Sequence, residues 1–429
     1  MNSQLQFKLN WERSDGGPPE EQITYASLGI WTDERAITRV EDLIAKTTRD
    51  VVRVSAYPLA LWLASNWWRL RWEVPTRESR EDWSMAHRVA AAGGGYLWPD
   101  LEIISHGDFI RLRARDTSNY DAASLSYLNN IDSSFPAGEF VGAVDEFVET
   151  VLERLSTQGI PDTPLHEIWS LVRQERRNAE MSRYRRLEAL LGYDAEEGPK
   201  DRINALLAAS SRLGEEAIAE VAADVGQVEA LEEVESRLDG ADELKIQDFS
   251  ILRAHIGGHR NHRYPWQRGE EAAKALREAI GHPRGPLDNA FLEQWLTLPE
   301  DVLKSPPSEG VAFAAALRDE AEADTARLVF RSNFVSGRRF EVVRLVGDHL
   351  VAAPASDRLL PATHAKTARQ SIQRAFAAEF LLPLEDLVER LGETPEDEDR
   401  VEDLAAEYEV SPVVVRTRLV NKGMSEAIV

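Results

Sequence analysis

The sequence predicts an α+β multidomain protein with a mixed α/β N-terminal domain, a helical middle region, and a third domain at the C-terminus. The first observation is length, because 429 residues exceed one ordinary hydrophobic core and fit two or three domains. The second is composition: 43% hydrophobic and 29% charged residues are close to soluble globular averages. The third is hydrophobic periodicity, which changes along the chain. It places the domains at residues 1–139, 140–250 and 264–429, with a linker at 251–263.

Alternating and helical spacing both occur in the first domain. Residues 5–11 and 110–115 alternate apolar with polar side chains, which indicates two half-buried strands. Between them, residues 58–71 carry apolar side chains at helical spacing. Residues 83–92 predict a second, short helix that ends at the glycines of 93–95. We therefore expect a domain in which helices pack against strands.

Two features of this domain admit a functional interpretation beside the structural one. The triple glycine invites comparison with a phosphate loop, but it lacks the GxGxxG spacing and a following Lys-Ser or Lys-Thr, so we expect a helix end. A tryptophan cluster could serve as an aromatic cage or a stacking platform. Its near-helical spacing favours the hydrophobic core instead. The cluster consists of Trp62, Trp67, Trp68 and Trp72.

The middle region carries apolar residues at helical spacing throughout and predicts four to six antiparallel helices. Its residues 215–243 contain eleven acidic side chains and a single base, Arg237. This pattern is typical of an amphipathic helix with an acidic, solvated face. Docking of a basic partner on that face is the alternative.

Three histidines in the predicted linker have a spacing that suggests a metal cluster: His255, His259 and His262. Gly257 and Gly258 would break a helix that aligned the first two, and no acidic residue stands beside them. A glycine- and arginine-rich linker is the simpler interpretation.

Several segments of the third domain occur in an order that resembles a known family. They are an amphipathic helix at 264–277, a hairpin within 310–333, an Arg-Arg-Phe lead at 338–340, the sequence RAFAAEFLLP at 374–383, and a helix-turn-helix pattern at 404–424. In this order they resemble ImmA/IrrE-type zinc metallopeptidases, whose second signature reads EANxFAAxLLMP. The resemblance implies a C-terminal zincin-like fold with a helix-turn-helix-like tail.

The resemblance also implies a metal site, and there the sequence departs from the family. In HExxH, two histidines one helical turn apart bind zinc and the glutamate is the general base. Counted from the Arg-Arg-Phe lead, these positions hold Arg344, Leu345 and Asp348. The third ligand, which the resemblance implies just before the second signature, falls within residues 370–373, with Ile372 the favoured position. A guanidinium is permanently charged and leucine transfers no proton. We therefore expect a degenerate site with no catalytic residue, no bound metal and no cofactor.

Two hypotheses concern this degenerate site. Arg344 and Asp348, spaced i and i+4 on one helix, would form an ion pair that occupies the space of the zinc. Alternatively, His349 and His364, with Asp348, would form a rearranged metal centre and preserve a peptidase.

The favoured function is a non-catalytic pseudo-metallopeptidase that serves as a protein-binding or regulatory module in a bacterial stress, mobile-element or phage-related system. Its partner would be a protein or peptide, and the candidate partner-binding residues are His349, Arg416, Arg418 and Lys422. A DNA-binding regulator is the alternative, although a net charge of −24 disfavours nucleic acid. A third interpretation, a hydrolase site in the first domain, rests on residues whose spacing matches no catalytic motif: Asp100, Glu102, His106 and Asp108.

The remaining composition bears on the compartment. The chain has no cysteine, which excludes disulfides and thiolate ligands and fits a reducing cytosol. No secretory signal is visible, and the most apolar run, residues 54–64, is about half the length of a membrane-spanning helix. We predict a cytoplasmic protein with no membrane partner.

Overall fold

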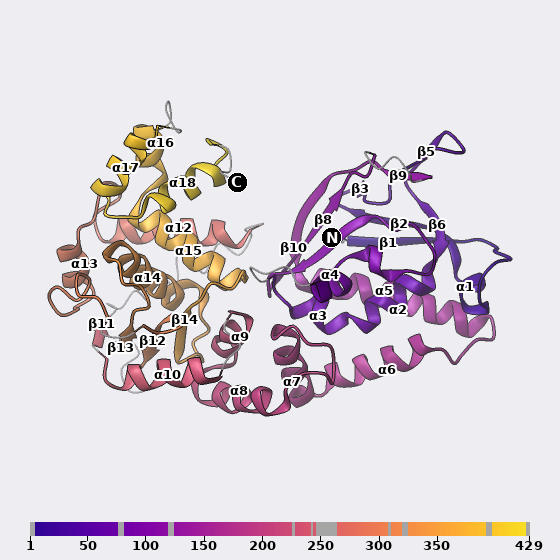
Figure 1. Ribbon diagram of the computed structural model, residues 1–429, viewed down its shortest axis with the longest axis horizontal. Helices are drawn as coiled ribbons and strands as arrows, with labels where there is room; N and C mark the ends of the chain where they lie inside the picture. Colours follow the sequence, from indigo (N-terminus) through magenta and orange to yellow (C-terminus); the bar gives the residue numbers. More distant parts are fainter. Residues whose placement is uncertain are drawn as a thin grey trace. The chain divides into compact units, whose positions relative to one another are not determined.

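The computed structural model describes residues 5–75, 81–118, 124–224, 228–241, 243–245, 264–307, 310–319, 325–391 and 397–425. The chain forms two compact units, residues 1–203 and 204–429, drawn from indigo to magenta and from magenta to yellow in Figure 1. Both mix helices with antiparallel sheets, so the α+β class is confirmed. The unit boundary falls inside the predicted helical region, whose helices are therefore divided between the two units. The predicted linker and its three histidines lie outside the described residues.

The first unit contains three antiparallel sheets and a set of helices. Their orders are β1-β2-β3 with β6 also on β2, then β10-β8-β7, then β5-β4-β9. The elements are β1 (Leu5–Trp11), α1 (Pro19–Ile23), β2 (Tyr25–Thr32), β3 (Arg35–Ala36), β4 (Val40–Asp42), β5 (Thr47–Arg49), β6 (Val52–Ser55), α2 (Ala56–Ser65), α3 (Trp67–Trp72), α4 (Glu81–His87), η1 (Val89–Ala92), β7 (Asp100–Ser105), β8 (Phe109–Arg115), β9 (Leu125–Tyr127), β10 (Ile131–Pro136), α5 (Ala137–Thr157), α6 (Pro164–Arg177) and α7 (Ala179–Leu190).

The two predicted strands of this unit are confirmed as β1 and β8. In β8, Ile110, Leu112 and Ala114 are buried while the arginines between them are partly exposed. Helix α5 packs against β1, β8 and β10, and Figure 1 shows it with α2 and α3 on one side of the strands. Alternation along a strand therefore positions the core here, as the sequence indicates.

The predicted helices of this unit are present, with one interruption. The helix expected at 58–71 is broken at Asn66, which lies between α2 and α3 and donates a hydrogen bond from its side chain to the Trp62 carbonyl. The second helix changes to a 3₁₀ turn and ends at Gly93, whose φ of 66° suits glycine. The tryptophan cluster lies in the core, with Trp62, Trp67 and Trp68 buried.

The second unit is built on one four-stranded antiparallel sheet, in the order β11-β13-β12-β14. The unit boundary lies within α8, at residues 203 and 204. The elements are α8 (Lys200–Leu213), α9 (Glu215–Asp224), α10 (Val228–Asp239), β11 (Glu243–Lys245), α12 (Pro265–Ala279), α13 (Asn289–Trp295), β12 (Ala314–Arg318), β13 (Thr325–Val329), α14 (Val335–Gly347), η2 (Asp348–Ala352), β14 (Leu359–Ala362), α15 (Ala368–Leu381), α16 (Leu384–Leu391), α17 (Glu398–Glu407) and α18 (Pro412–Asn421).

Helix α15 is the centre of this unit and packs against both α12 and α14 (Figure 1). Each neighbour places a glycine at the contact. A Cβ on Gly269 of α12 would lie 2.4 Å from the Ile372 carbonyl oxygen, and one on Gly347 of α14 would lie 2.6 Å from the Phe376 ring. Both contacts are too close for any other residue, so the two glycines permit the tight packing of the three helices.

The predicted hairpin is confirmed as β12 and β13, which pair from Ala315 with Val329 to Arg318 with Ala326. Strand β11 was not expected; it comes from the helical region and pairs with β13. The helix expected at 215–243 forms as α9 and α10. The prediction of a solvated acidic face suits α10 but is wrong for α9, whose residues from Ala217 to Ala223 are all buried.

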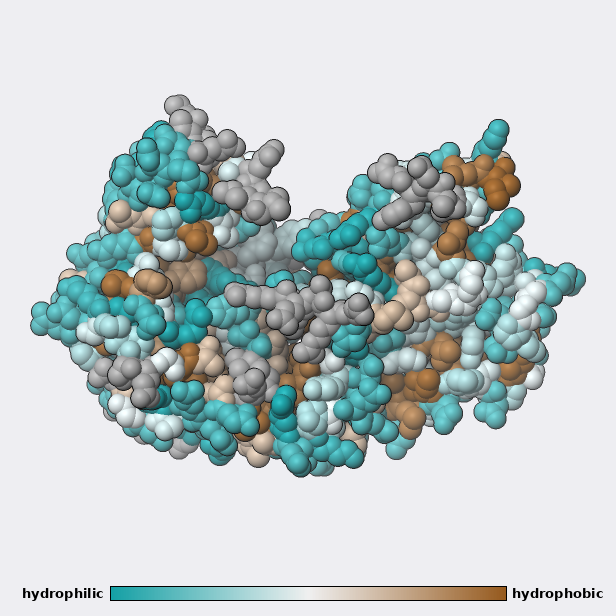
Figure 2. Space-filling model, viewed as in Figure 1, coloured by the Kyte–Doolittle hydropathy of each residue, from teal (hydrophilic) through white to brown (hydrophobic). Residues whose placement is uncertain are grey.

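The surface drawn in Figure 2 is mostly hydrophilic, as the charge of −24 leads one to expect. Apolar atoms gather at the upper right, where Figure 1 places β5. Leu43 and Ile44, in the turn between β4 and β5, are 48% and 81% exposed. Among the described residues, no helix is long and apolar enough to cross a membrane.

Candidate functional site

The positions of the degenerate motif lie at the C-terminal end of α14 and in the single π turn η2 that follows it. Arg344 is buried, and its Nη2 donates to the Thr363 carbonyl at 2.6 Å, to Gln370 Oε1 at 2.5 Å and to Gln373 Oε1 at 3.3 Å. The two glutamine amides in turn donate to the carbonyl of Pro361 in β14. Amides and carbonyls therefore surround this guanidinium.

Asp348 is fully buried and its partner is Arg369 of α15, which donates from Nε at 2.8 Å and from Nη2 at 2.7 Å. Arg369 also donates from Nη1 to Asp357 at 2.7 Å. The predicted Arg344–Asp348 ion pair is therefore wrong. The planar fork of Arg369 reaches both oxygens of Asp348 from the facing helix, while Arg344 turns toward the strand carbonyls.

The other two degenerate positions are apolar and buried. Leu345 and Ile372 both belong to the hydrophobic core of the second unit. Neither has a donor atom for a metal, and Ile372 lies where α12 approaches α15. Of the four predicted residues, the structure joins Arg344 and Asp348 to one polar network through α15 and leaves the other two in the core.

Helix α9 completes this network with two carboxylates that were not predicted from the sequence, Glu220 and Asp224. Glu220 accepts a hydrogen bond from Thr367 Oγ1 at 2.6 Å. Thr367 also caps α15, because its hydroxyl accepts a hydrogen bond from the backbone N–H of Gln370. Burial raises the pKa of Glu220 to about 7, although the charge of Arg369 acts against the rise. The i, i+4 spacing of Glu220 and Asp224 on an alanine-rich helix was the available sequence signal.

Asp224 ties α9 to the loop before α15. Its carboxylate accepts from the His364 backbone amide at 2.9 Å, and its Oδ2 lies 3.8 Å from His364 Nδ1. Burial acts to raise the pKa of Asp224, but the hydrogen bonds from His364 hold it below the ordinary value. His364, in this loop, therefore has a carboxylate partner from helix α9.

His349 faces a different neighbour. It is 5% exposed, and its Nδ1 lies 3.1 Å from Nε of Arg318, which donates to it. The rearranged centre of His349, His364 and Asp348 is thus not assembled, and no group of three His, Asp or Glu side chains suited to a metal ion exists within the described ranges. Burial also removes His349 from the surface at which a partner contact was predicted.

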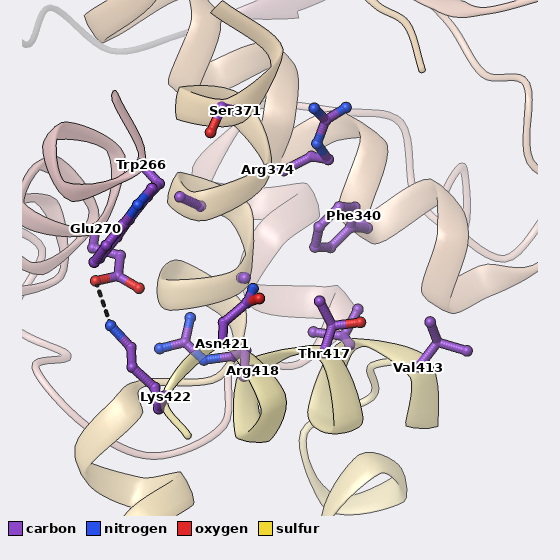
Figure 3. Close-up of a pocket in the computed structure, with 13 residues that line it drawn as sticks. Trp266, Glu270, Phe340, Ser371, Arg374, Val413, Thr417, Arg418, Asn421 and Lys422 are labelled. Atoms are coloured by element: carbon purple, nitrogen blue, oxygen red, sulfur yellow. Dashed lines mark hydrogen bonds and ion pairs between the residues drawn. The ribbon is translucent and has the colours of Figure 1, made fainter. Parts of the chain in front are cut away.

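A pocket of about 580 Å³ opens beside the network, between α12, α14, α15 and α18 (Figure 3). Figure 3 shows Trp266 and Glu270 on one side, Phe340 on the other, Ser371 and Arg374 above, and side chains of α18 below. The wall is mainly apolar, and Trp266 and Val413 remain 38% and 65% exposed. The lining residues are Trp266, Glu270, Phe340, Ser371, Arg374, Ala375, Ala378, Val413, Val414, Thr417, Arg418, Asn421 and Lys422.

Two cations of the pocket already have carboxylate partners. Lys422 pairs with Glu270 at 3.0 Å and lies 4.7 Å from the centre of the Trp266 ring. Arg418 is buried and pairs closely with Glu379. These are two of the predicted partner-binding residues, and the pocket brings them together.

The third cation of the pocket differs. Arg374 donates from Nη2 to the Ala365 carbonyl at 3.1 Å, and none of the described carboxylates lies within 4.0 Å of its guanidinium. Burial lowers its pKa, while the more distant charges of Glu220 and Asp224 act to raise it. Arg374 was not predicted from the sequence, because one arginine in an alanine-rich helix gives no signal by itself.

The expected tail segment contains two helices, α17 and α18, joined by a turn that contains Glu409 at a φ of 51°. Arg416 on α18 pairs with Glu398 on α17 and does not line the pocket. All three cations predicted on this helix therefore pair with carboxylates. Such pairing reduces the positive charge available to a nucleic-acid phosphate.

Within the part of the chain that the structure describes, the side chains named for a hydrolase site in the first domain form no group suited to a metal ion. Glu102 is buried in β7 and accepts from Arg88 at 2.8 Å and from Arg113 at 3.5 Å. Asp100 lies at the start of the same strand. The pairing of Glu102 with two arginines is a structural role.

No protein-family model, curated protein or solved structure matches the chain.

Proposed function

We propose that the second unit is a non-catalytic, protein-binding module on a zincin-like scaffold of the ImmA/IrrE type. The order of its elements supports this: an entry helix, a hairpin, a helix at the motif position, a second long helix and a helix-turn-helix tail.

The observation that carries the proposal is the chemistry at the motif position. Arg344 and Leu345 stand where the first zinc ligand and the general base would be, and Asp348 is bound in a bidentate pair with Arg369. A buried guanidinium repels a cation, and burial lowers the pKa of Arg344 only to about 9, so it remains charged at neutral pH. These residues do not fit a zinc ion, and no hydrolytic step is assigned to them.

The pocket beside the motif position supplies the binding surface. It is concave, largely apolar, and large enough for a short peptide segment. We infer that it holds part of a partner protein, in the bacterial regulatory or phage-related setting that the resemblance implies. A DNA-binding role for the tail is the second candidate, and the paired cations of α18 weigh against it.

Site-specific photo-crosslinking in cells tests this function. A crosslinking amino acid replaces Val413 at the mouth of the pocket, and the matched control replaces Val388, which is 46% exposed on α16 and does not line the pocket. We expect a discrete protein adduct from position 413 and none from position 388. Adducts with nucleic acid, or no adduct specific to position 413, would contradict the proposal.

A further inference from the structure

We propose that the pocket recognises a carboxylate that stands next to an apolar side chain in a peptide, and that Arg374 binds this carboxylate. The inference rests on the proposed function, since it names the chemistry of the ligand that the pocket takes.

The three cations that line the pocket differ in their carboxylate partners. Among the described residues that line it, Lys422 and Arg418 are neutralised by Glu270 and Glu379, whereas Arg374 has no carboxylate within 4.0 Å. A partly buried guanidinium has lost part of its hydration, and a single carbonyl replaces little of it. An incoming carboxylate can accept two parallel hydrogen bonds from such a group.

A second guanidinium adds to the local positive charge. Arg344 is buried and, among the residues that the structure describes, has no carboxylate within 4.0 Å and no hydrogen-bond partner for its Nε. The positive charge of Arg374 is, after burial, the largest influence that lowers the pKa of Arg344, so the two guanidinium groups repel each other. Glu220 and Asp224 offset this repulsion from farther away. An anion bound at Arg374 would offset it more directly.

The apolar wall specifies the neighbour of the carboxylate. Phe340 of α14 and Val414 of α18 line the pocket, and the exposed Val413 and Trp266 form its rim together with the partly exposed Lys422. Figure 3 shows Arg374 above the pocket and Phe340 at its side. An aliphatic or aromatic side chain can therefore be buried against this wall while the adjacent carboxylate reaches the guanidinium.

The test uses full-length protein and fluorescein-labelled hexapeptide pools, with binding followed by fluorescence anisotropy. One pair of pools fixes a central Leu-Glu or Leu-Gln. A second pair fixes a C-terminal leucine with a free carboxylate or an amide. We expect at least one carboxylate pool to bind about tenfold or more tightly than its neutral counterpart, and Arg374→Gln to abolish the difference. Arg390→Gln, which removes an exposed ion pair with Glu407 outside the pocket, should leave it unchanged.

A second variant guards against misfolding of Arg374→Gln. Thr417 is exposed on α18 at the pocket, so Thr417→Glu places a negative charge there without disturbing the core, and Thr417→Gln is its neutral match. We expect Thr417→Glu to weaken the carboxylate pools several-fold relative to Thr417→Gln. Equal effects of the two variants would overturn the inference.

The outcomes separate the inference from the proposed function. Equal binding of acidic and neutral pools overturns the role of Arg374 while a peptide-binding pocket remains. If no pool binds but position 413 still crosslinks to a protein, the inference fails and the proposed function stands. If neither peptide binding nor crosslinking occurs, both fail.

Discussion

Two arginines of the same helix show how differently this unit uses one residue type. Arg369 is buried and forms ion pairs with Asp348 and Asp357, both at 2.7 Å. Arg374, five positions later, lines a pocket and has one carbonyl partner. The two side chains lie on one α-helix, so the facing elements decide their roles. A guanidinium that pairs with carboxylates stabilises the interior of the unit. A guanidinium that lines a pocket without a carboxylate partner provides a site for an anion.

The largest expected effect comes from removing the matched arginine. Arg369→Met should destabilise the second unit by about 3–5 kcal/mol, because it leaves buried carboxylates without their positive partner. The parallel substitution Arg374→Met should cost about 1 kcal/mol, since it loses one hydrogen bond. Thermal unfolding of both variants measures the difference. Equal losses would break the distinction between the two arginines.

The buried carboxylate of α9 makes stability depend on pH. The pKa of Glu220 is raised from 4.5 to about 7, so the folded chain holds this proton more tightly than the unfolded chain does. Stability is therefore greatest below about pH 4.5 for this group and falls as the pH rises to 7. The loss amounts to as much as about 3 kcal/mol.

Denaturant unfolding of the wild-type chain and of Glu220→Gln between pH 5 and 8 checks this dependence. The substitution should remove that part of the slope, whereas Glu232→Gln, at an exposed position of α10, should retain it. A slope that is the same in all three proteins would mean that Glu220 is not the group that titrates.

Removal of the side chain that caps the N-terminus of α15 should reduce the stability of the unit by a smaller amount. The Thr367 hydroxyl accepts a hydrogen bond from the backbone N–H of Gln370 and donates one to Glu220, so Thr367→Val removes a cap and a buried donor. A loss of about 1–2 kcal/mol is expected, and Thr367→Ser, which keeps the hydroxyl, should recover most of it. Chemical denaturation of the two variants provides the measurement, and indistinguishable midpoints would exclude the hydroxyl as the cause.

The rim of the pocket should contribute least to stability. Lys422→Gln removes the ion pair with Glu270, which is partly solvated, and should cost less than about 1 kcal/mol. It should leave the fold intact, as circular dichroism and the unfolding temperature would show. A loss as large as that of Arg369→Met would mean that the pocket rim is part of the core.

Much of the fold could be predicted from local patterns. Alternation identified β1 and β8, and two apolar runs around an acidic turn identified the β12–β13 hairpin. Such patterns depend on neighbours in the chain and need no tertiary information. Strand β11 was missed because its three residues are too few for a periodicity, and its partner β13 is distant in sequence.

The candidate site could be predicted only in part. The absence of zinc ligands at Arg344 and Leu345 follows from the sequence once the family resemblance is assumed. The partner of Asp348 does not, because Arg369 is 21 residues away and local spacing favours the residue one turn earlier. The burial of Glu220 was missed for a related reason: a high density of acids suggests solvation, and only the packing of α9 against β14 reverses it.

Zinc content distinguishes a metal-free binding module from a zinc peptidase. Full-length protein is equilibrated with excess zinc, passed through gel filtration, and analysed by mass spectrometry of the metal, with Asp348→Asn in parallel. We expect far less than one zinc per chain in both proteins, because Arg344 and the Asp348–Arg369 pair occupy the motif position. One zinc per wild-type chain that Asp348→Asn loses would contradict it.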